Sequence, residues 1–135
     1  MKVWGPKASG KTGVMDEDDV IAFAQSKVGV GTEVWRKNLT KAFSAISNYQ
    51  WGKTSGGATD LLHNNKKIFH FSEGKVAGGQ GASLFFTCEG GINASIIAIG
   101  RHASHDKKGG KSTTSYRIEW NAPSWQLSKL ITLPD

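Results

Sequence analysis

The sequence contains a single cysteine, Cys88, among its 135 residues. One cysteine cannot form an intramolecular disulfide, and it cannot supply the two or four thiolate ligands of many structural zinc sites. The sequence also lacks any apolar run near the roughly 20 residues that a membrane-spanning helix needs. We therefore predict a domain without membrane spans that is stabilised by packing alone. Its length fits one domain, which we place at residues 15–135 after a flexible lead-in of residues 1–14.

The chain contains fewer acidic than basic residues, and the two kinds are unevenly distributed along it. The chain has 17 Lys and Arg against 11 Asp and Glu, which gives a formal net charge of +6. Acids fill all four positions of residues 16–19, whereas residues 101–117 carry five Lys or Arg and one acid. This pattern indicates an extended polyanion, such as a nucleic acid, as the partner of the basic segment.

Helical patterns come first in the chain. Residues 16–27 predict a helix because acids fill its first turn, where the helix dipole favours them, and apolar residues recur at helical spacing. An apolar stripe predicts a second helix over residues 32–49, with Thr32 as its N-cap. We expect a connection at residues 51–58 and a short helical turn at residues 59–63.

Strand patterns occupy the second half. Gly90-Gly91 is a hairpin signal between two of the expected strands, and residues 102–114 are predicted to be a basic loop between the last two. Residues 124–133 fit either a closing strand or an extended tail. The predicted strands are Lys67–Phe71, Ser83–Glu89, Ile92–Arg101 and Ser115–Trp120. We therefore predict an α+β domain in which the N-terminal helices pack on a mainly antiparallel sheet of about four strands.

Residues Gly5 to Thr12 match the phosphate-loop pattern G-x-x-x-x-G-K-[ST]. A working phosphate loop follows a buried strand and opens a helix. Here only four residues precede Gly5, and Gly13 and Asp16 stand where apolar helical residues would be needed. We therefore discount a nucleotide site in this segment, and a nucleotide-dependent enzyme that uses it is kept only as a third hypothesis.

The spacing His102-x-x-His105-Asp106 offers two imidazoles and a carboxylate, which are ordinary transition-metal ligands. A metal nuclease needs further ligands that converge from other strands, and the remaining acids beyond the helical segment are scattered along the sequence. We predict no metal ligands and no cofactor, and a metal-dependent nuclease stays open as an alternative.

The basic segment of residues 101–117 contains the groups that metal-free RNA cleavage requires. These are a base for the 2′-hydroxyl, an acid for the leaving 5′-oxygen, and cations around the developing charge. Either of two histidines in the segment can be base or acid, and its cations and hydroxyls can hold the phosphate. Such cleavage gives a 2′,3′-cyclic phosphate and a 5′-hydroxyl.

Strand phase adds His70, which we place on the face opposite Phe69 and Phe71, and Arg117, which we expect to point away from the core. Trp120 is a candidate stacking surface for unpaired bases. The candidate catalytic residues are His102, His105, Lys111, Thr114, Tyr116 and His70. The candidate substrate-binding residues are Arg101, Lys107, Lys108, Thr113, Arg117 and Trp120.

This order of elements, with His, Lys, Thr and Tyr near the last strand pair, resembles the barnase/EndoU/colicin/RelE group of small bacterial ribonuclease toxins. Within that group the chain is most similar to C-terminal nuclease domains of contact-dependent growth inhibition and other polymorphic toxins. EndoU-like members use two histidines and a lysine, followed by a Ser/Thr-x-Tyr/Phe pair. Thr114-Ser115-Tyr116 matches that pair, and His102, His105 and Lys111 match by residue type.

The resemblance implies a metal-independent endoribonuclease toxin domain, with transfer RNA as its target. It also implies a cognate immunity protein that blocks the site, and a monomer outside that complex. Delivery as part of a larger secreted or cell-surface effector, and action in the cytoplasm of a neighbouring bacterium, are further implications. A non-catalytic basic RNA-binding module remains the alternative from a different class.

Overall fold

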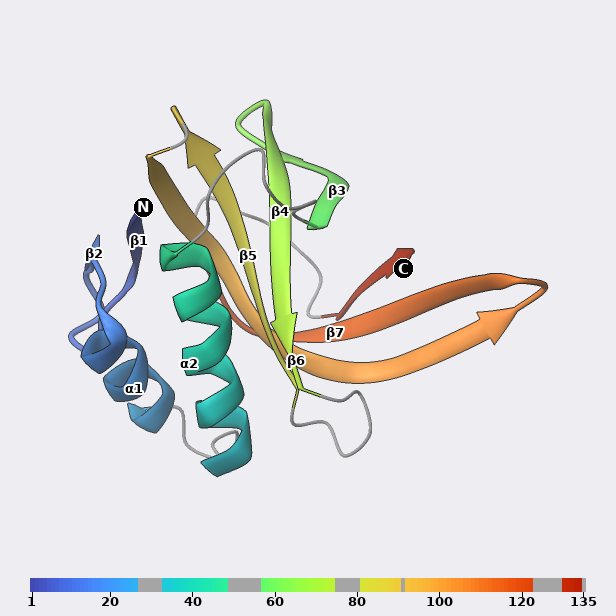
Figure 1. The fold of residues 1–135 in the computed structure, drawn as a ribbon, viewed down its shortest axis with the longest axis horizontal. Coiled ribbons are helices and arrows are strands. Elements are labelled where there is room, and N and C mark those ends of the chain that lie inside the picture. The colour runs from blue at the N-terminus through green and yellow to red at the C-terminus, as the bar shows by residue number, and fades with distance from the viewer. Residues whose placement is uncertain (27–32, 49–56, 75–80, 91, 123–129, 135) are drawn as a thin grey trace.

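The computed structural model describes residues 1–26, 33–48, 57–74, 81–90, 92–122 and 130–134 of the chain. The described residues form an α+β fold with two helices and a mostly antiparallel sheet (Figure 1). The helices are α1 (Glu17–Ser26) and α2 (Glu33–Ser47). The strands are β1 (Lys2–Pro6), β2 (Thr12–Val14), β3 (Gly57–His63), β4 (Lys66–Glu73), β5 (Ala82–Glu89), β6 (Asn93–Lys108), β7 (Lys111–Asn121) and β8 (Leu130–Pro134).

Both predicted helices are present, with ends within two residues of the expected ones. The backbone N–H of Asp19 donates to the Asp16 carboxylate at 2.9 Å, and the N–H of Asp16 donates to Asp19 at 3.0 Å. These reciprocal bonds satisfy donors that a helix N-terminus otherwise leaves unpaired. The expected N-cap of α2, Thr32, lies outside the described residues.

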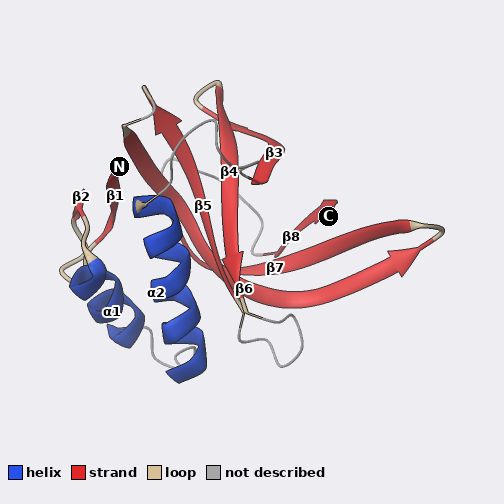
Figure 2. Cartoon of the chain, viewed as in Figure 1, coloured by secondary structure: helices blue, strands red, loops and turns tan. Residues whose placement is uncertain are grey.

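The prediction of about four strands is too low, because the described chain contains eight. Neighbouring strands follow the order β2-β1-β6-β5-β4-β3, and β7 pairs with both β6 and β8. The pairing of β1 with β6 is parallel, and the other described pairings are antiparallel. Strand β6 reaches two partners along one edge, because residues 93–95 pair with β1 and residues 98–108 pair with β7 (Figure 2).

Three segments differ from the secondary structure that the sequence predicts. Residues 1–14, expected to be a flexible lead-in, form β1 and β2, and Val3 is buried. Residues 59–63, expected to be a helical turn, belong to β3. Residues 102–114, expected to be a loop, extend β6 and β7 into a long hairpin that turns at Gly109-Gly110. Polar strands of this kind carry little hydrophobic alternation, so their sequence resembles a loop.

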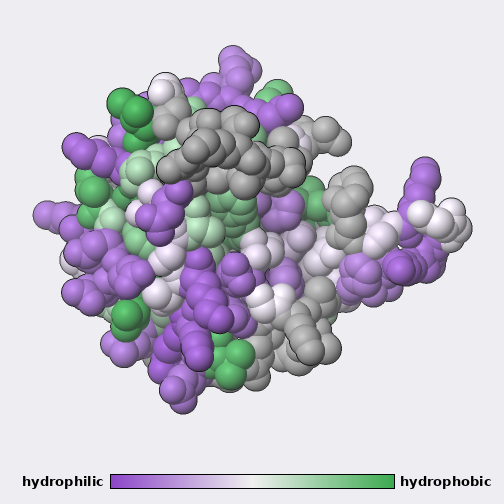
Figure 3. Space-filling model, in the orientation of Figure 1, coloured by the Kyte–Doolittle hydropathy of each residue, from purple (hydrophilic) through white to green (hydrophobic). Residues whose placement is uncertain are grey.

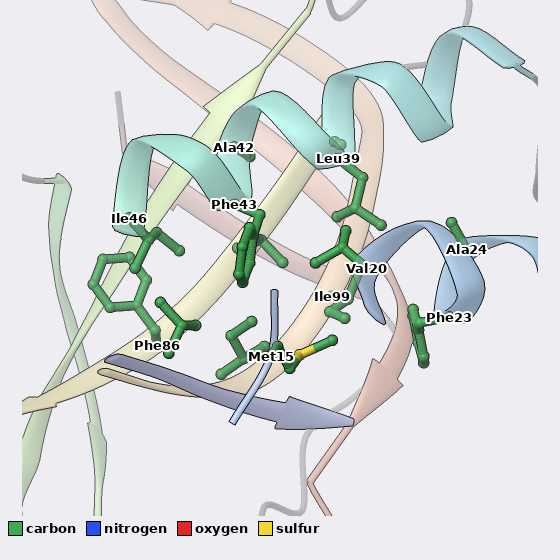
Figure 4. Close-up of a cluster of buried hydrophobic side chains, with 14 of the residues drawn as sticks. Met15, Val20, Phe23, Ala24, Leu39, Ala42, Phe43, Ile46, Phe86 and Ile99 are labelled. Carbon is green, nitrogen blue, oxygen red and sulfur yellow. The ribbon is translucent and has the colours of Figure 1, made fainter. Parts of the chain in front are cut away.

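The first hydrophobic core lies between the helices and one face of the sheet (Figure 4). Helix α2 supplies its central part, and Phe86 and Ile99 of the sheet face the helices. The buried side chains of the two helices are Val20, Phe23, Ala24, Trp35, Leu39, Ala42, Phe43 and Ile46. This apolar stripe on each helix explains why both pack on the sheet.

A second hydrophobic core lies on the opposite face of the same sheet. It joins Phe85 and Ile97 of the central strands to Tyr116 of β7 and to Ile131 and Leu133 of β8. Two helices packed on a four-stranded sheet would leave the other face of the sheet exposed. Here β7 and β8 contribute side chains that cover part of that face. Tyr116 belongs to this core and also contacts His70.

Candidate active site

The predicted site residues divide between the two faces of the β6–β7 hairpin. Residues that pair directly across antiparallel strands project from the same face. The pairs His102↔Tyr116, His105↔Thr114 and Lys107↔Ser112 define one face, which we name the Tyr116 face. The pairs Arg101↔Arg117, Asp106↔Thr113 and Lys108↔Lys111 define the other, which we name the Arg117 face. The hairpin therefore separates the histidines from most of the cations.

Two histidines from distant parts of the sequence meet at Tyr116. The His70 ring lies 5.7 Å from the Tyr116 ring, and the His102 ring lies 5.2 Å from it, between centroids. The Tyr116 hydroxyl approaches Nε2 of His70 at 3.5 Å. His70 comes from β4, His102 from β6 and Tyr116 from β7, so the curvature of the sheet brings three strands together here. We name this group the histidine–tyrosine site.

Phe85 forms the floor of this site. Its ring stacks on His70 with centroids 5.8 Å apart and meets Tyr116 edge-on at 5.5 Å. Phe85 belongs to the second core and is fully buried, so it fixes both polar rings from below. The sequence does not single out Phe85, although strand alternation places its partner His70 on the face opposite Phe69 and Phe71, as predicted.

Gly81 holds the backbone of His102 at the edge of the site. The N–H of His102 donates to the Gly81 carbonyl at 2.9 Å, and a Cβ at position 81 would collide with the His102 imidazole. His102 is only 5% exposed, and it also lines a surface depression of about 230 Å³. Glycine at position 81 is therefore needed for the observed position of the ring, and no pattern in the sequence marks it.

His105 lies further along the Tyr116 face and makes a separate group. Its Nδ1 is 3.0 Å from the Thr114 hydroxyl, and its Nε2 is 3.2 Å from the Ser112 hydroxyl. Both ring nitrogens are thus engaged by hydroxyl groups of β7, and the bond directions depend on the tautomer. Thr114 therefore positions His105, and Ser112 is a partner that the sequence does not suggest.

Arg101 and Arg117, which project from the Arg117 face, border the depression that His102 also lines. Arg101 forms an ion pair with Glu119, with 2.9 Å between Nε and Oε1, whereas Arg117 is exposed, as predicted. The depression of about 230 Å³ is lined by Arg101, His102, Ala103 and Arg117, and Arg117 also borders a second one of about 470 Å³. Guanidinium groups at such a depression can bind phosphate oxygens.

Lys107, Lys108 and Lys111 lie at the tip of the hairpin and are exposed. Lys108 lies six positions beyond His102 in β6. At about 3.3 Å per residue this places the tip roughly 20 Å from the histidine–tyrosine site. The structure therefore does not bring Lys111 together with His70, His102 and Tyr116.

Trp120 lies away from the predicted binding surface. Its ring packs edge-on against Phe23 of α1, with centroids 6.3 Å apart, as part of the first core. The alternation in β7 predicts that Trp120 shares a face with Ile118. That prediction is wrong because the register shifts at Glu119, where Ile99 pairs with Trp120 and the next residue, Gly100, pairs with Ile118. Such a β-bulge reverses the facing of the residues beyond it.

The spacing His102-x-x-His105-Asp106 does not gather its three side chains. A second register shift, at Ala103, keeps His102 and His105 on the Tyr116 face, while Asp106 projects from the Arg117 face. Within the part of the chain that the structure describes, no three His, Cys, Asp or Glu side chains are placed to hold a metal ion. Burial raises the pKa of the Cys88 thiol to about 12, which disfavours the thiolate form at neutral pH.

The phosphate-loop pattern at residues 5–12 lies in the β1–β2 hairpin. Gly5 pairs with Gly13 and Pro6 with Thr12, and the N–H of Lys7 donates to the Lys11 carbonyl at 2.9 Å. A strand therefore follows the pattern where a nucleotide-binding loop would open a helix.

The chain matches no family model, no curated protein and no solved structure. Of the two described helices, neither is long and apolar enough to cross a membrane.

Proposed function

We propose that this chain is a metal-independent endoribonuclease toxin domain that acts through the histidine–tyrosine site. The observation that carries the proposal is the meeting of His70 and His102 at the ring of Tyr116, from three different strands. Imidazole is the side chain best suited to move protons at neutral pH, because its ordinary pKa lies near 6.5. Two imidazoles beside one tyrosine ring supply the two proton-transfer groups and a hydrogen-bond donor.

These groups account for cleavage by an internal nucleophile. One neutral imidazole removes the proton from the ribose 2′-hydroxyl, whose oxygen then attacks the adjacent phosphorus. The other histidine, protonated, gives its proton to the departing 5′-oxygen. The products are a 2′,3′-cyclic phosphate and a 5′-hydroxyl, and the protein ends with its two protonation states exchanged. The Tyr116 hydroxyl donates to a non-bridging oxygen, where negative charge develops.

The remaining candidate residues take supporting roles in this proposal. Arg117, beside the depression that His102 lines, binds a phosphate of the RNA backbone, and Arg101 contributes to the same positive surface. His105, held by Thr114 and Ser112, contacts the neighbouring nucleotide from the Tyr116 face. Lys111 binds substrate from the hairpin tip instead of joining the reaction, because roughly 20 Å separates it from His102.

The biological setting in this proposal rests on the resemblance to polymorphic toxin domains. The domain is delivered as part of a larger effector, cleaves transfer RNA in the cytoplasm of a neighbouring bacterium, and is blocked by a cognate immunity protein. Co-expression tests this setting directly. We expect growth arrest when the chain is expressed alone, and relief when a small adjacent open reading frame is expressed with it.

The chemistry is tested by incubating the chain with total RNA in EDTA and analysing the fragment ends. We expect fragments ending in 2′,3′-cyclic phosphate, and a loss of at least a hundredfold in rate for His70→Gln and His102→Gln. Removing a general acid or base typically lowers a rate by 10²–10⁴-fold. His63→Gln is the matched control, since His63 lies at the β3–β4 turn and outside the site.

Three outcomes contradict the proposal. RNA that stays intact at every protein concentration, while still bound, favours a non-catalytic RNA-binding module. Cleavage that requires an added divalent cation favours a metal-dependent nuclease. Full activity in both histidine variants, with far-UV circular dichroism unchanged, places the chemistry elsewhere in the molecule.

A further inference from the structure

The outer part of the β6–β7 hairpin projects from the body of the molecule as a two-stranded ribbon (Figures 1 and 2). Residues 103–111 are all exposed, and β8 pairs with β7 only from Thr113 inward. We name residues 104–112 the arm. In the space-filling view the arm is a largely hydrophilic extension from the body of the molecule (Figure 3). It contributes nothing to either core, so its length and composition require another explanation.

The composition of the arm fits a polyanion. The arm holds three lysines and one acid, Asp106, and it contains no Val, Leu, Ile, Met or aromatic residue besides His105. Lys107 lies on the Tyr116 face, whereas Lys108 and Lys111 lie on the Arg117 face. Cations therefore project from both faces of the ribbon at its tip. A single flat anionic surface would leave one of these faces without a partner.

A nucleic-acid groove presents phosphates on two sides. A two-stranded β-ribbon is narrow enough to enter the roughly 12 Å wide major groove of B-form DNA. In A-form RNA the minor groove is wide and shallow, and it displays 2′-hydroxyls between its two phosphate strands. A ribbon lying in such a groove directs one face toward each phosphate strand. The two serines of the arm, Ser104 and Ser112, can then bond to 2′-hydroxyls.

We propose that the arm binds the minor groove of a double-stranded segment of the RNA substrate. Lys107 contacts one phosphate strand, and Lys108 and Lys111 contact the other. The histidine–tyrosine site, roughly 20 Å from the tip, then receives an unpaired nucleotide beyond the end of the stem. Unpaired nucleotides are free to adopt the geometry that attack by the 2′-oxygen requires, whereas paired ones are not. The identification of RNA as the ligand rests on the proposed function.

The test measures binding by the full chain carrying His70→Gln, which suppresses cleavage in the proposed function. The probes are a 12-base-pair RNA stem with a single-stranded tail, the tail alone, and a DNA duplex of the same sequence. The arm variant is Lys107→Gln/Lys108→Gln/Lys111→Gln. The control variant, Lys2→Gln/Lys37→Gln/Lys41→Gln, removes the same charge from exposed positions on β1 and α2.

We expect the arm variant to bind the tailed stem at least tenfold more weakly, with a change below threefold for the tail alone. The slope of log affinity against log salt should become shallower by about 2–3, because three phosphate contacts are lost and each contributes about 0.7–0.9. The control variant should change the affinity for the tailed stem less than threefold.

Equal losses in the arm and control variants overturn the proposal, since net charge alone then explains binding. A loss on the tail as large as on the tailed stem also overturns it. Binding of the DNA duplex as tight as that of the RNA stem contradicts the assignment to RNA. Binding can be measured without cleavage, so the two proposals can fail separately. If the wild-type chain leaves RNA intact but the arm variant still loses affinity for the tailed stem, the proposed function is refuted and this inference stands.

Discussion

At the scale of single residues, the candidate site depends on a few close approaches. His102 keeps its place because its N–H bonds to Gly81 and because position 81 carries no side chain. Phe85 supports His70 by stacking, and Tyr116 meets all three of these rings. The site is thus shaped by residues that have no proton-transfer chemistry of their own.

Gly81→Ala tests whether the position of the His102 imidazole matters for RNA cleavage. The new methyl group would collide with the His102 imidazole, so we expect RNA cleavage to fall at least tenfold. Overpacking of this kind costs about 1–3 kcal/mol of stability. Cleavage rates and urea unfolding measure the two effects. Gly13→Ala is the control, because its methyl group would meet only the flexible end of Lys7. Unchanged cleavage in Gly81→Ala would show that the His102 ring is free to move without consequence.

At the scale of elements, local sequence patterns predict the helices and the apolar strands, which depend mainly on residues close together in the sequence. Acids in its first turn and recurring apolar residues predict the first helix, and an apolar stripe predicts the second. Apolar and aromatic runs predict the inner halves of β4 to β7. The sequence does not predict strand β1, because β1 pairs with residues far away in the sequence, as Lys2 does with Asn93. No local pattern near Lys2 indicates that partner. The arm has the sequence pattern of a loop because its strands are polar on both faces.

The bulges explain which parts of the candidate site the sequence could not predict. Simple alternation places His70 correctly, because β4 pairs with β5 without a shift between Phe69 and Glu73. It misplaces Trp120, because the extra residue Glu119 reverses the facing of the residue after it. A bulge depends on the partner strand as well as on its own residues, so the two faces of the β6–β7 hairpin emerge only from the paired structure.

The start of α1 gives a prediction about pH. The backbone N–H of Asp19 donates to Asp16 and is the main cause that lowers the pKa of this carboxyl from its ordinary value of 3.8. The folded state therefore favours the ionised form. That stabilisation is complete above pH 3.8 and is lost as the pH falls through the lowered folded-state pKa.

Thermal unfolding of Asp16→Asn should show this dependence. We expect the wild type to unfold at a higher temperature at pH 7, and the difference to shrink once the pH drops below 3.8. Asp18→Asn is the control, because it removes the same charge from the same turn. A difference that stays constant down to about pH 2, or an equal effect from Asp18→Asn, would show that the Asp16 charge is not what the helix start requires.

At the scale of the whole molecule, the two faces of one sheet each form part of a hydrophobic core. The first core anchors the helices to one face, and the second lies directly beneath the histidine–tyrosine site. Strand β8 closes the second core, where Ile131 pairs with Tyr116 and Leu133 pairs with Thr114. Both cores therefore contribute to the stability of the fold, whereas the geometry of the site depends on the side chains of the second.

Paired truncations, one in each core, test this division. Leu39→Ala in the first core and Ile131→Ala in the second each remove a buried aliphatic side chain, and each should cost about 2–5 kcal/mol. Measured well below the unfolding temperature, Leu39→Ala should keep RNA cleavage within twofold of the wild type. Ile131→Ala should lower it at least tenfold, because Tyr116 loses a neighbour on β8 that helps to position its ring. Urea unfolding gives the folded fraction by which each rate is corrected. Equal corrected rates in the two variants would mean that β8 stabilises the sheet without positioning Tyr116.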